Sequence, residues 1–274
     1  QPAHAQPGVD RQESGDAIRA ERAISLTPHI TELIFAAGAG DKIVGTVIGS
    51  DYPEAALDIP IIGDGLNIKV EKALAVRPDV VIAWQASGAA TTLTPMLTRL
   101  HIPLIYSAPR ALQDIPAEII RFGKLFDTSR IADPAASALA GRLRELEQRY
   151  AQRAPVSVFI EIGTTPLYTI GNDPLLNDVL RICGGVNIYG STAIAAPQVS
   201  AESVLVLQPD AIIAPAIDDQ RLAEARQRWS VLRLPAARQG HIYGIDPDKL
   251  FRPGPRLIEA AESLCQYLDK VRKG

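Results

Sequence analysis

Apolar runs alternate with amphipathic stretches along most of this chain. Short apolar runs predict buried strands at 22–26, 42–48, 80–83, 104–106, 156–162 and 241–245. Between them, apolar residues recur at helical spacing, as in Ile30, Leu33, Ile34 and Ala37. Buried strands that alternate with amphipathic helices are typical of a parallel sheet, so the pattern predicts an α/β fold.

One thirteen-residue phrase occurs twice, at 71–83 and at 202–214. Both copies begin with Glu, contain a Pro-Asp pair and end in Ile-Ala. Each predicts a helix that begins near the glutamate and a buried strand after the Pro-Asp pair. The offset of 131 residues is too long for a solenoid, whose units run roughly 20–50 residues. The repeat therefore predicts two similar Rossmann-like lobes with a ligand cleft between them.

The two predicted lobes are separated by a long amphipathic stretch. Asp133 can cap a helix that Pro134 begins, and the apolar residues up to Ala151 then lie on one face. Residues 1–21 lack hydrophobic periodicity, which predicts a disordered leader. We therefore expect lobes at 22–131 and 153–274, joined by one rigid helix at 132–152.

Charge and motifs argue against several functions. The chain has 28 Lys and Arg against 31 Asp and Glu, so its net charge of −3 gives no reason to expect nucleic acid as a partner. No apolar run approaches the ~20 residues of a membrane span. The dinucleotide fingerprint, the Walker A loop, the G-x-S-x-G elbow and the H-E-x-x-H motif are absent. We expect a binding protein, not an enzyme, without a cofactor of its own.

Cys183 and Cys265 are the two cysteines of the chain. In an exported protein they would form a disulfide, whereas in a cytosolic protein they would be buried thiols. Ala3, His4 and Ala5 follow the small-x-small pattern that precedes a signal-peptidase site. The cysteines alone leave both alternatives open.

Aromatic and polar residues follow the predicted strands in both halves. They are Tyr52, Trp84, Tyr168, Asp248, Phe251 and Arg252. The crevice beyond the carboxyl ends of parallel strands is the usual ligand site of such sheets. Any one of these aromatic residues could simply pack against its own lobe. Their shared placement favours a cleft for a large, rigid and partly apolar ligand.

Three other polar residues each have two interpretations. His29 lies in the N-terminal turn of the first predicted helix and could bind a metal in the ligand, although we favour the simpler interpretation of an exposed polar residue near a helix cap. Glu71 and Glu202 hold equivalent places in the repeat. They could be carboxylates that suit a helix N-terminus, or a symmetric pair that docks on the basic groups of a two-fold partner.

Several short segments together resemble a known family. They are Ile24–Pro28, Thr31–Leu33, Ser50–Pro53, Arg77–Trp84, Cys183–Ile188, Pro197–Ser200 and Pro255–Arg256. These segments are similar to the helix-linked periplasmic substrate-binding proteins of ABC importers for cobalamin, haem and iron-siderophores. The resemblance extends from about Arg22 to Lys270 and is strongest to the cobalamin binders.

This resemblance implies a function and a set of site residues. Tyr52, Trp84, Tyr168 and Asp248 would contact cobalamin or a related corrinoid. Glu71 and Glu202 would engage arginines of a membrane permease dimer, and Cys183 and Cys265 would form a disulfide. The protein would be a periplasmic monomer, exported with its signal peptide removed.

The chain also departs from the cobalamin binders at three places. Those proteins carry a Trp in the loop that corresponds to 63–65 and another beside Pro197, where this chain has Ala196. His29 replaces a small residue. A different corrinoid, or a haem held by His29, is therefore the alternative ligand. An α/β enzyme is the alternative of another class, but no set of residues here predicts a turnover.

Overall fold

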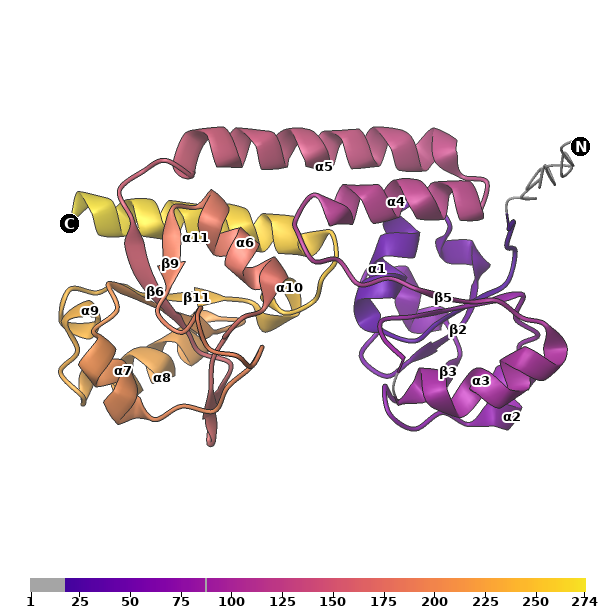
Figure 1. Cartoon of the computed structure of the whole chain (residues 1–274), viewed down its shortest axis with the longest axis horizontal. Coiled ribbons are helices and arrows are strands. Elements are labelled where there is room, and N and C mark those ends of the chain that lie inside the picture. The colour runs from indigo at the N-terminus through magenta and orange to yellow at the C-terminus, as the bar shows by residue number, and fades with distance from the viewer. Residues whose placement is uncertain (1–17, 87) are drawn as a thin grey trace, which may run out of the picture.

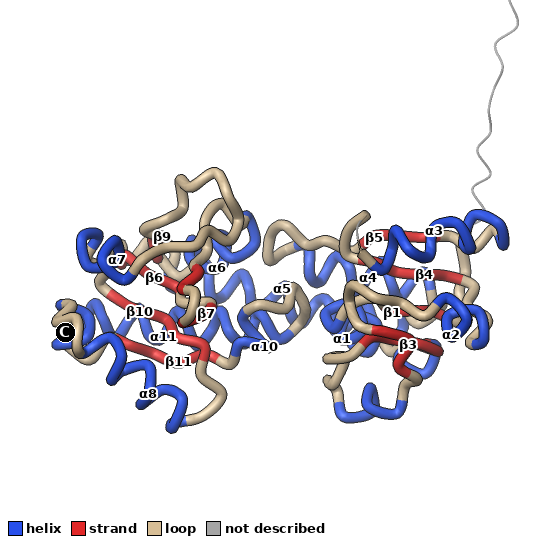
Figure 2. The backbone as a smooth tube through the Cα atoms, turned by 90° about the horizontal axis from the view of Figure 1, so that it is seen from below, coloured by secondary structure: helices blue, strands red, loops and turns tan. Residues whose placement is uncertain are grey.

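The chain forms two α/β lobes that share a layer of long helices (Figure 1). The structure is a computed structural model and describes residues 18–86 and 88–274. Seen from below, each sheet lies in its own lobe, with α1 (Pro28–Ala36) and α10 (Pro247–Leu250) between the two (Figure 2). The predicted two-lobed α/β fold is confirmed.

The two sheets repeat one strand order. The first contains β1 (Ala23–Ser25), β2 (Ile43–Val47), β3 (Ile61–Gly63), β4 (Val80–Ala83) and β5 (Leu104–Tyr106), in the order β3-β2-β1-β4-β5. The second contains β6 (Val156–Ile160), β9 (Gly185–Asn187), β10 (Ala211–Pro215) and β11 (Ile242–Ile245), in the order β11-β10-β6-β9. All these pairings are parallel, so β2-β1-β4-β5 corresponds to β9-β6-β10-β11.

Both copies of the repeated phrase form the predicted helix and strand. The copies are α2 (Val70–Ala75) with β4, and α7 (Ala201–Leu207) with β10. Arg77 and Gln208 precede the Pro-Asp pairs and are left-handed, with φ of 46° and 45°. The carboxylate of Asp79 then accepts the Arg22 N–H at 3.0 Å, and that of Asp210 accepts the Ser157 N–H at 2.9 Å. The repeated Asp thus ties each turn to the central strand of its sheet.

The remaining helices cover the sheets or join the lobes. They are α3 (Ala89–Leu100), α4 (Asp114–Leu125), α5 (Ser129–Tyr150), α6 (Pro174–Ile182), α8 (Asp219–Ser230), α9 (Pro235–Arg238) and α11 (Arg256–Lys273), with 3₁₀ turns η1 (Gly40–Lys42) and η2 (Glu54–Asp58). The hairpin of β7 (Gly163–Thr164) and β8 (Leu167–Tyr168) follows β6. None of the helices in the described part of the chain combines the length and apolar character that a bilayer crossing requires.

Helix α5 joins the lobes but begins earlier than predicted. It starts at Ser129, so Asp133 is not its cap, and Pro134 lies inside it. The reason is the tight α4–α5 hairpin, in which Asp127 is left-handed and Thr128 donates from Oγ1 to the Ala37 carbonyl at 2.6 Å. Pro134 lies in the second turn of this 22-residue helix, where it supplies no backbone N–H for an intrahelical bond.

The end of the predicted leader belongs to the N-terminal lobe. Ala20 is buried and its N–H donates to the Leu125 carbonyl at 2.9 Å. Glu21 forms an ion pair with Lys42 at 2.9 Å. The prediction of disorder through residue 21 is therefore wrong at these two positions, while residues 1–17 lie outside the described part.

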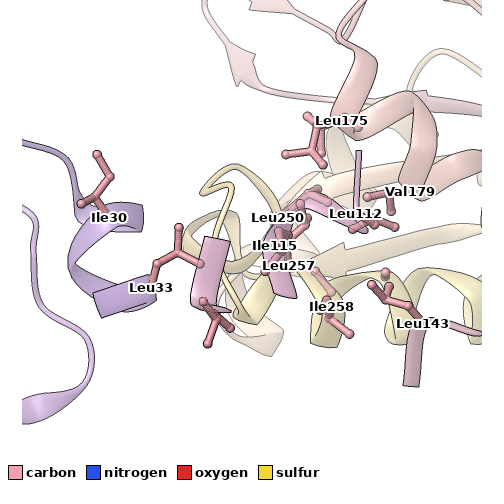
Figure 3. Close-up of a cluster of buried hydrophobic side chains, with 14 of the residues drawn as sticks. Ile30, Leu33, Leu112, Ile115, Leu143, Leu175, Val179, Leu250, Leu257 and Ile258 are labelled. Atoms are coloured by element: carbon pink, nitrogen blue, oxygen red, sulfur yellow. The ribbon is translucent and has the colours of Figure 1, made fainter. Parts of the chain in front are cut away.

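One apolar core continues from the first lobe into the second. Figure 3 shows side chains of α4, α5, α6, α10 and α11 that gather where the lobes meet, among them Ile115, Leu250 and Leu257, together with Leu112 from the turn before α4. Ile30 and Leu33 of α1 belong to the same cluster. Each Å² of apolar surface that is removed from water stabilises the folded state by about 25 cal/mol. The shared core therefore stabilises the contact between the two lobes.

The two cysteines are joined by a disulfide, as the resemblance implies. Cys183, at the end of α6, and Cys265, within α11, have their sulfur atoms 2.02 Å apart. Both side chains are fully buried. The bond fastens α6 to the helical layer of the C-terminal lobe.

Candidate ligand-binding site

A cavity of about 230 Å³ lies between the lobes, beyond the carboxyl ends of β4 and β5. The N-terminal lobe contributes Trp84 and the loop 108–110 to this interlobe cavity, and the C-terminal lobe contributes 173–176 and residues near Phe251. Trp84 is 46% exposed, directly after the fully buried β4. The structure thus brings Trp84 and Phe251, two of the predicted site residues, to one cavity.

His29 supports the Trp84 indole from within the N-terminal lobe. The two rings meet edge to face, with centroids 5.8 Å apart and an angle of 77° between their planes. Nε2 of His29 lies 3.0 Å from the Ser107 carbonyl oxygen, and Nδ1 lies 2.9 Å from Thr27 Oγ1. Because a carbonyl only accepts, Nε2 carries the proton and Nδ1 accepts from the threonine.

The favoured reading of His29 as an exposed residue is wrong. The side chain is only 2% exposed, because α1 lies under the loops that contain Trp84 and Ser107. Burial lowers the pKa of His29 to about 4, although the bond to the Ser107 carbonyl opposes this shift. The ring is therefore neutral at physiological pH, and its two bonds leave neither nitrogen free to bind a metal.

An ion cluster joins the lobes next to this cavity. Arg252, after β11, lies 2.9 Å from Asp51 of the other lobe and 3.2 Å from Asp248. Burial alone would lower the pKa of Arg252, but the bond to Asp51 and the charges of Asp248 and Glu32 outweigh burial and raise the pKa above its usual value. The predicted residues Arg252 and Asp248 are thus neighbours, and their partner Asp51 was not predicted.

The buried half of this ion cluster is the pair of Glu32 and Arg256. Nε of Arg256 donates to Glu32 Oε1, and the second Glu32 oxygen lies 3.6 Å from Arg252. Burial raises the pKa of Glu32, while Arg256 and Arg252 oppose the rise. The Arg256 guanidinium also lies 4.0 Å from the centroid of the Tyr52 ring, a cation–π contact. Tyr52 is therefore placed at the lobe junction.

Glu32 and Arg256 were not identified as site residues from the sequence. The signal was the position of Glu32 on α1, where it adjoins Leu33 of the apolar face. A carboxylate that such a face carries into the core requires a cationic partner. The sequence cannot say that this partner lies 224 residues away.

Tyr168 is held apart from the other predicted aromatic residues. It was predicted in a loop, but it lies in β8 and bridges to Gln198. Its side chain is half-buried, and it does not line the interlobe cavity. Across the described residues, no three His, Cys, Asp or Glu side chains are grouped as metal ligands.

A family model described as "Periplasmic binding protein" matches residues 24–249 of the chain. The chain belongs to this family. The vitamin B12-binding protein of Vibrio cholerae is 34% identical over 256 residues, which cover 93% of this chain and 91% of that protein.

Solved structures of other periplasmic binding proteins share the fold. The periplasmic vitamin B12 binding protein BtuF of Vibrio cholerae has a TM-score of 0.84 and 33% identity, over 94% of this chain and 100% of that one. The periplasmic heme-binding protein RhuT from Roseiflexus sp. RS-1, in its apo form, has a TM-score of 0.76 and 26% identity, over 92% and 99% of the two chains.

The repeat glutamates of this periplasmic binding protein lie on the outside of both lobes. Glu71 and Glu202 are in the first turns of α2 and α7, and both are exposed. Within the described residues, neither forms an ion pair. Each is followed three residues later by a partly exposed leucine, Leu74 or Leu205. The two lobes thus present equivalent surfaces with an uncompensated carboxylate.

Proposed function

We propose that this protein captures a corrinoid, vitamin B12 or a close relative, in the periplasm and delivers it to the permease dimer of an ABC importer. The observation that carries the proposal is the half-exposed Trp84 wall of a cavity that both lobes line. The similarity to vitamin B12-binding proteins, at 34% identity over nearly the whole chain, supports the same ligand class.

The chemistry of the cleft suits a corrinoid. A corrin is a large, rigid macrocycle with apolar faces and a rim of amide groups. Trp84 and Phe251 offer flat apolar contacts, and such contacts cost little conformational entropy on binding. Asp248 is half-exposed at the edge of the ion cluster, where its free lone pairs can accept from rim amides.

The proposed role is binding without a chemical step. Rigid aromatic walls and a floor fixed by ion pairs keep the cleft in one shape before the ligand arrives. Preorganisation of this kind raises affinity because less order must be created on binding. The protein itself would supply no cofactor, since the corrinoid is cargo.

Haem is the second candidate, because a heme-binding protein has the same fold at 26% identity. The predicted iron ligand in this chain was His29. Both of its ring nitrogens have partners inside the lobe, so coordination of haem iron through either nitrogen would break its hydrogen bond and would require the buried ring to move. The corrinoid is therefore the preferred ligand.

Calorimetry and absorption spectroscopy distinguish the two ligands. Cyanocobalamin and cobinamide are titrated into the purified protein, and haemin is added to a separate sample that is then desalted. We expect a saturable corrinoid signal and no Soret band after desalting. A retained Soret band that disappears in His29→Ala, with no corrinoid binding, would reverse the assignment.

The partner surface would be the pair of repeat helices. Glu71 and Glu202 are at matching positions of two similar lobes, which fits the two-fold symmetry of a permease dimer. Their exposed carboxylates would pair with basic groups on the two permease subunits, and Leu74 and Leu205 would add an apolar contact beside each.

A further inference from the structure

The ring of Tyr52, in the N-terminal lobe, is covered on one face by a residue of the C-terminal lobe. Tyr52 lies in the loop after β2, and its side chain is 45% exposed. The guanidinium of Arg256, the first residue of α11, lies 4.0 Å from the centroid of the ring. A guanidinium within about 6 Å of an aromatic face is attracted to it, and its planar shape allows the two groups to stack. The exposed part of the ring is therefore what remains available to a ligand.

Arg256 is itself fixed in place by the lobe that carries Tyr52. Its Nε donates to Oε1 of Glu32 on α1, and the two side chains are only 12% and 2% exposed. The backbone before it is fixed as well, because the Gly254 carbonyl accepts the Leu257 N–H at 3.0 Å. The buried carboxylate thus sets the position of the guanidinium before any ligand is present.

The loop around Tyr52 is anchored separately from its ring. Thr46 Oγ1 donates to Ser50 Oγ at 2.9 Å, and the Ala56 N–H donates to the Pro53 carbonyl at 2.8 Å. These bonds set the course of the backbone on both sides of Tyr52. The rotation of the Tyr52 side chain is limited instead by what its ring contacts, and the Arg256 guanidinium is such a contact.

The turn that carries Arg256 also borders the interlobe cavity. Phe251, Pro253 and Leu257 of this turn line the cavity. Arg252 of the same turn pairs with Asp51, the residue before Tyr52. The fixed ring and the cavity lining are therefore attached to one segment of the chain. An aromatic side chain that is already held in one orientation loses little rotamer freedom when a ligand binds against it.

We propose that Arg256 is a positioning residue for ligand binding, which holds the Tyr52 ring in the orientation that the ligand meets and is itself held by Glu32. This inference rests on the proposed function. Without Arg256 the ring would lose both its cationic neighbour and its fixed orientation, and each loss weakens a contact to the ligand. We expect the two effects together to change the affinity by about tenfold.

The double variant Glu32→Met with Arg256→Met separates positioning from stability. It removes both charges at once, so no charge is left buried and unpaired, and its free energy of unfolding should stay close to that of the wild type. Calorimetry with cyanocobalamin should nevertheless show binding about tenfold weaker than that of the wild type. Arg142→Met with Glu262→Met is the matched control, because it removes an ion pair of 2.6 Å between α5 and α11 that is away from the cavity lining. This control should bind as the wild type does.

The substitution Tyr52→Ala tests whether Tyr52 and Arg256 act together. In the wild type it should weaken cyanocobalamin binding by about tenfold. In the double methionine variant it should add little, because the ring there has already lost its fixed orientation. Equal losses in the two backgrounds would overturn the inference, as would wild-type affinity of the double methionine variant. Either result would leave Arg256 with a structural role alone.

A measurement without ligand separates this inference from the proposed function. In protein labelled with fluorotyrosine, the fluorine resonance of Tyr52 is the one that disappears in Tyr52→Phe. It should move toward the position of a freely rotating tyrosine in the double methionine variant. It should also move in Arg256→Lys, which keeps the charge but loses the planar contact. An unmoved resonance would overturn the inference. If the resonance moves but no corrinoid binds to the wild type, the positioning of Tyr52 stands and the proposed function fails.

Discussion

Arg252 and Asp51 are 201 residues apart in the chain and 2.9 Å apart in the structure. Their ion pair joins the loop after α10 to the loop after β2, on opposite lobes. The buried pair of Glu32 and Arg256 adds a second link beside it. The junction beneath the cleft is therefore built from both halves of the chain.

Removal of Arg256 should destabilise the protein strongly. Arg256→Ala leaves the Glu32 carboxylate buried without its main partner, at a cost of about 3 kcal/mol in the free energy of unfolding. The double variant Glu32→Met with Arg256→Met should recover most of this loss, because no buried charge is left unpaired. Urea unfolding at pH 7 gives the free energy of unfolding of the wild type, of Arg256→Ala and of the double variant. Arg130→Ala, at an exposed position of α5, is the control and should change stability little.

The burial of His29 should make stability depend on pH. The folded pKa of about 4 is below the ordinary value of 6.5, so the unfolded chain binds more protons between these pH values. Stability should therefore fall by about 3 kcal/mol as the pH drops through that window, and this contribution should level off below it. Comparison of the wild type with His29→Gln by urea unfolding isolates the effect. His101→Asn, at an exposed position, is the control and should keep the pH dependence of the wild-type stability. If the free energy of unfolding of His29→Gln falls with pH in parallel with that of the wild type, the prediction is wrong.

Loss of the Trp84 side chain should weaken ligand binding without loss of the fold. The indole is the exposed aromatic wall of the interlobe cavity, and truncation of such a residue costs about 2 kcal/mol, or roughly thirtyfold in Kd. Calorimetry with cyanocobalamin compares Trp84→Ala with Leu57→Ala, which removes an exposed apolar side chain elsewhere. Equal affinities of the two variants would mean that Trp84 is not part of the site.

Charge reversal at the repeat glutamates should separate transport from binding. Glu71→Arg combined with Glu202→Arg would turn two attractions toward a basic partner into repulsions, so uptake of corrinoid by cells should be abolished. Each single variant should be impaired in part, and calorimetry should give the wild-type affinity for all of them. Glu54→Arg, at an exposed position outside the repeat, is the control. If transport persists in the double variant, the two carboxylates only stabilise the N-termini of their helices.

The disulfide should contribute several kcal/mol. It closes a loop over 82 positions of sequence, for which the chain-entropy model gives about 4.5 kcal/mol. Cys183→Ala with Cys265→Ala should lower the free energy of unfolding by about that amount, and reduction of the wild type should have a comparable effect. A double variant as stable as the oxidised wild type would show that the bond adds no stability.

Much of the fold was predictable because its signals are local. The apolar runs at 80–83 and 104–106 coincide with β4 and β5, and the repeated phrase correctly indicated two similar lobes. The start of α5 was missed because it depends on the α4–α5 hairpin. There the Thr128 hydroxyl binds a carbonyl 91 residues away, which no local pattern reveals.

The places of Trp84 and Phe251 at the interlobe cavity were predictable because both residues lie beyond the carboxyl ends of strands. Trp84 comes after a strand whose position is set by its own sequence, so its place at the sheet edge could be inferred. The burial of His29 depends on Ser107, 78 residues away, and on the fold of the loops above α1. The same holds for Glu32, whose partners come from the other lobe.

The apolar core that continues across the lobes has a kinetic consequence. To swing the lobes apart, the protein would have to expose side chains such as Leu112 and Leu257 to water and pull Glu32 away from its arginines. Exchange of a large ligand would then be slow whenever it requires the cleft to widen. Rapid release of a bound ligand would require contacts with another protein that offset the free energy of separating the lobes. A transporter that makes such contacts would then change the residence time of the ligand more than its affinity.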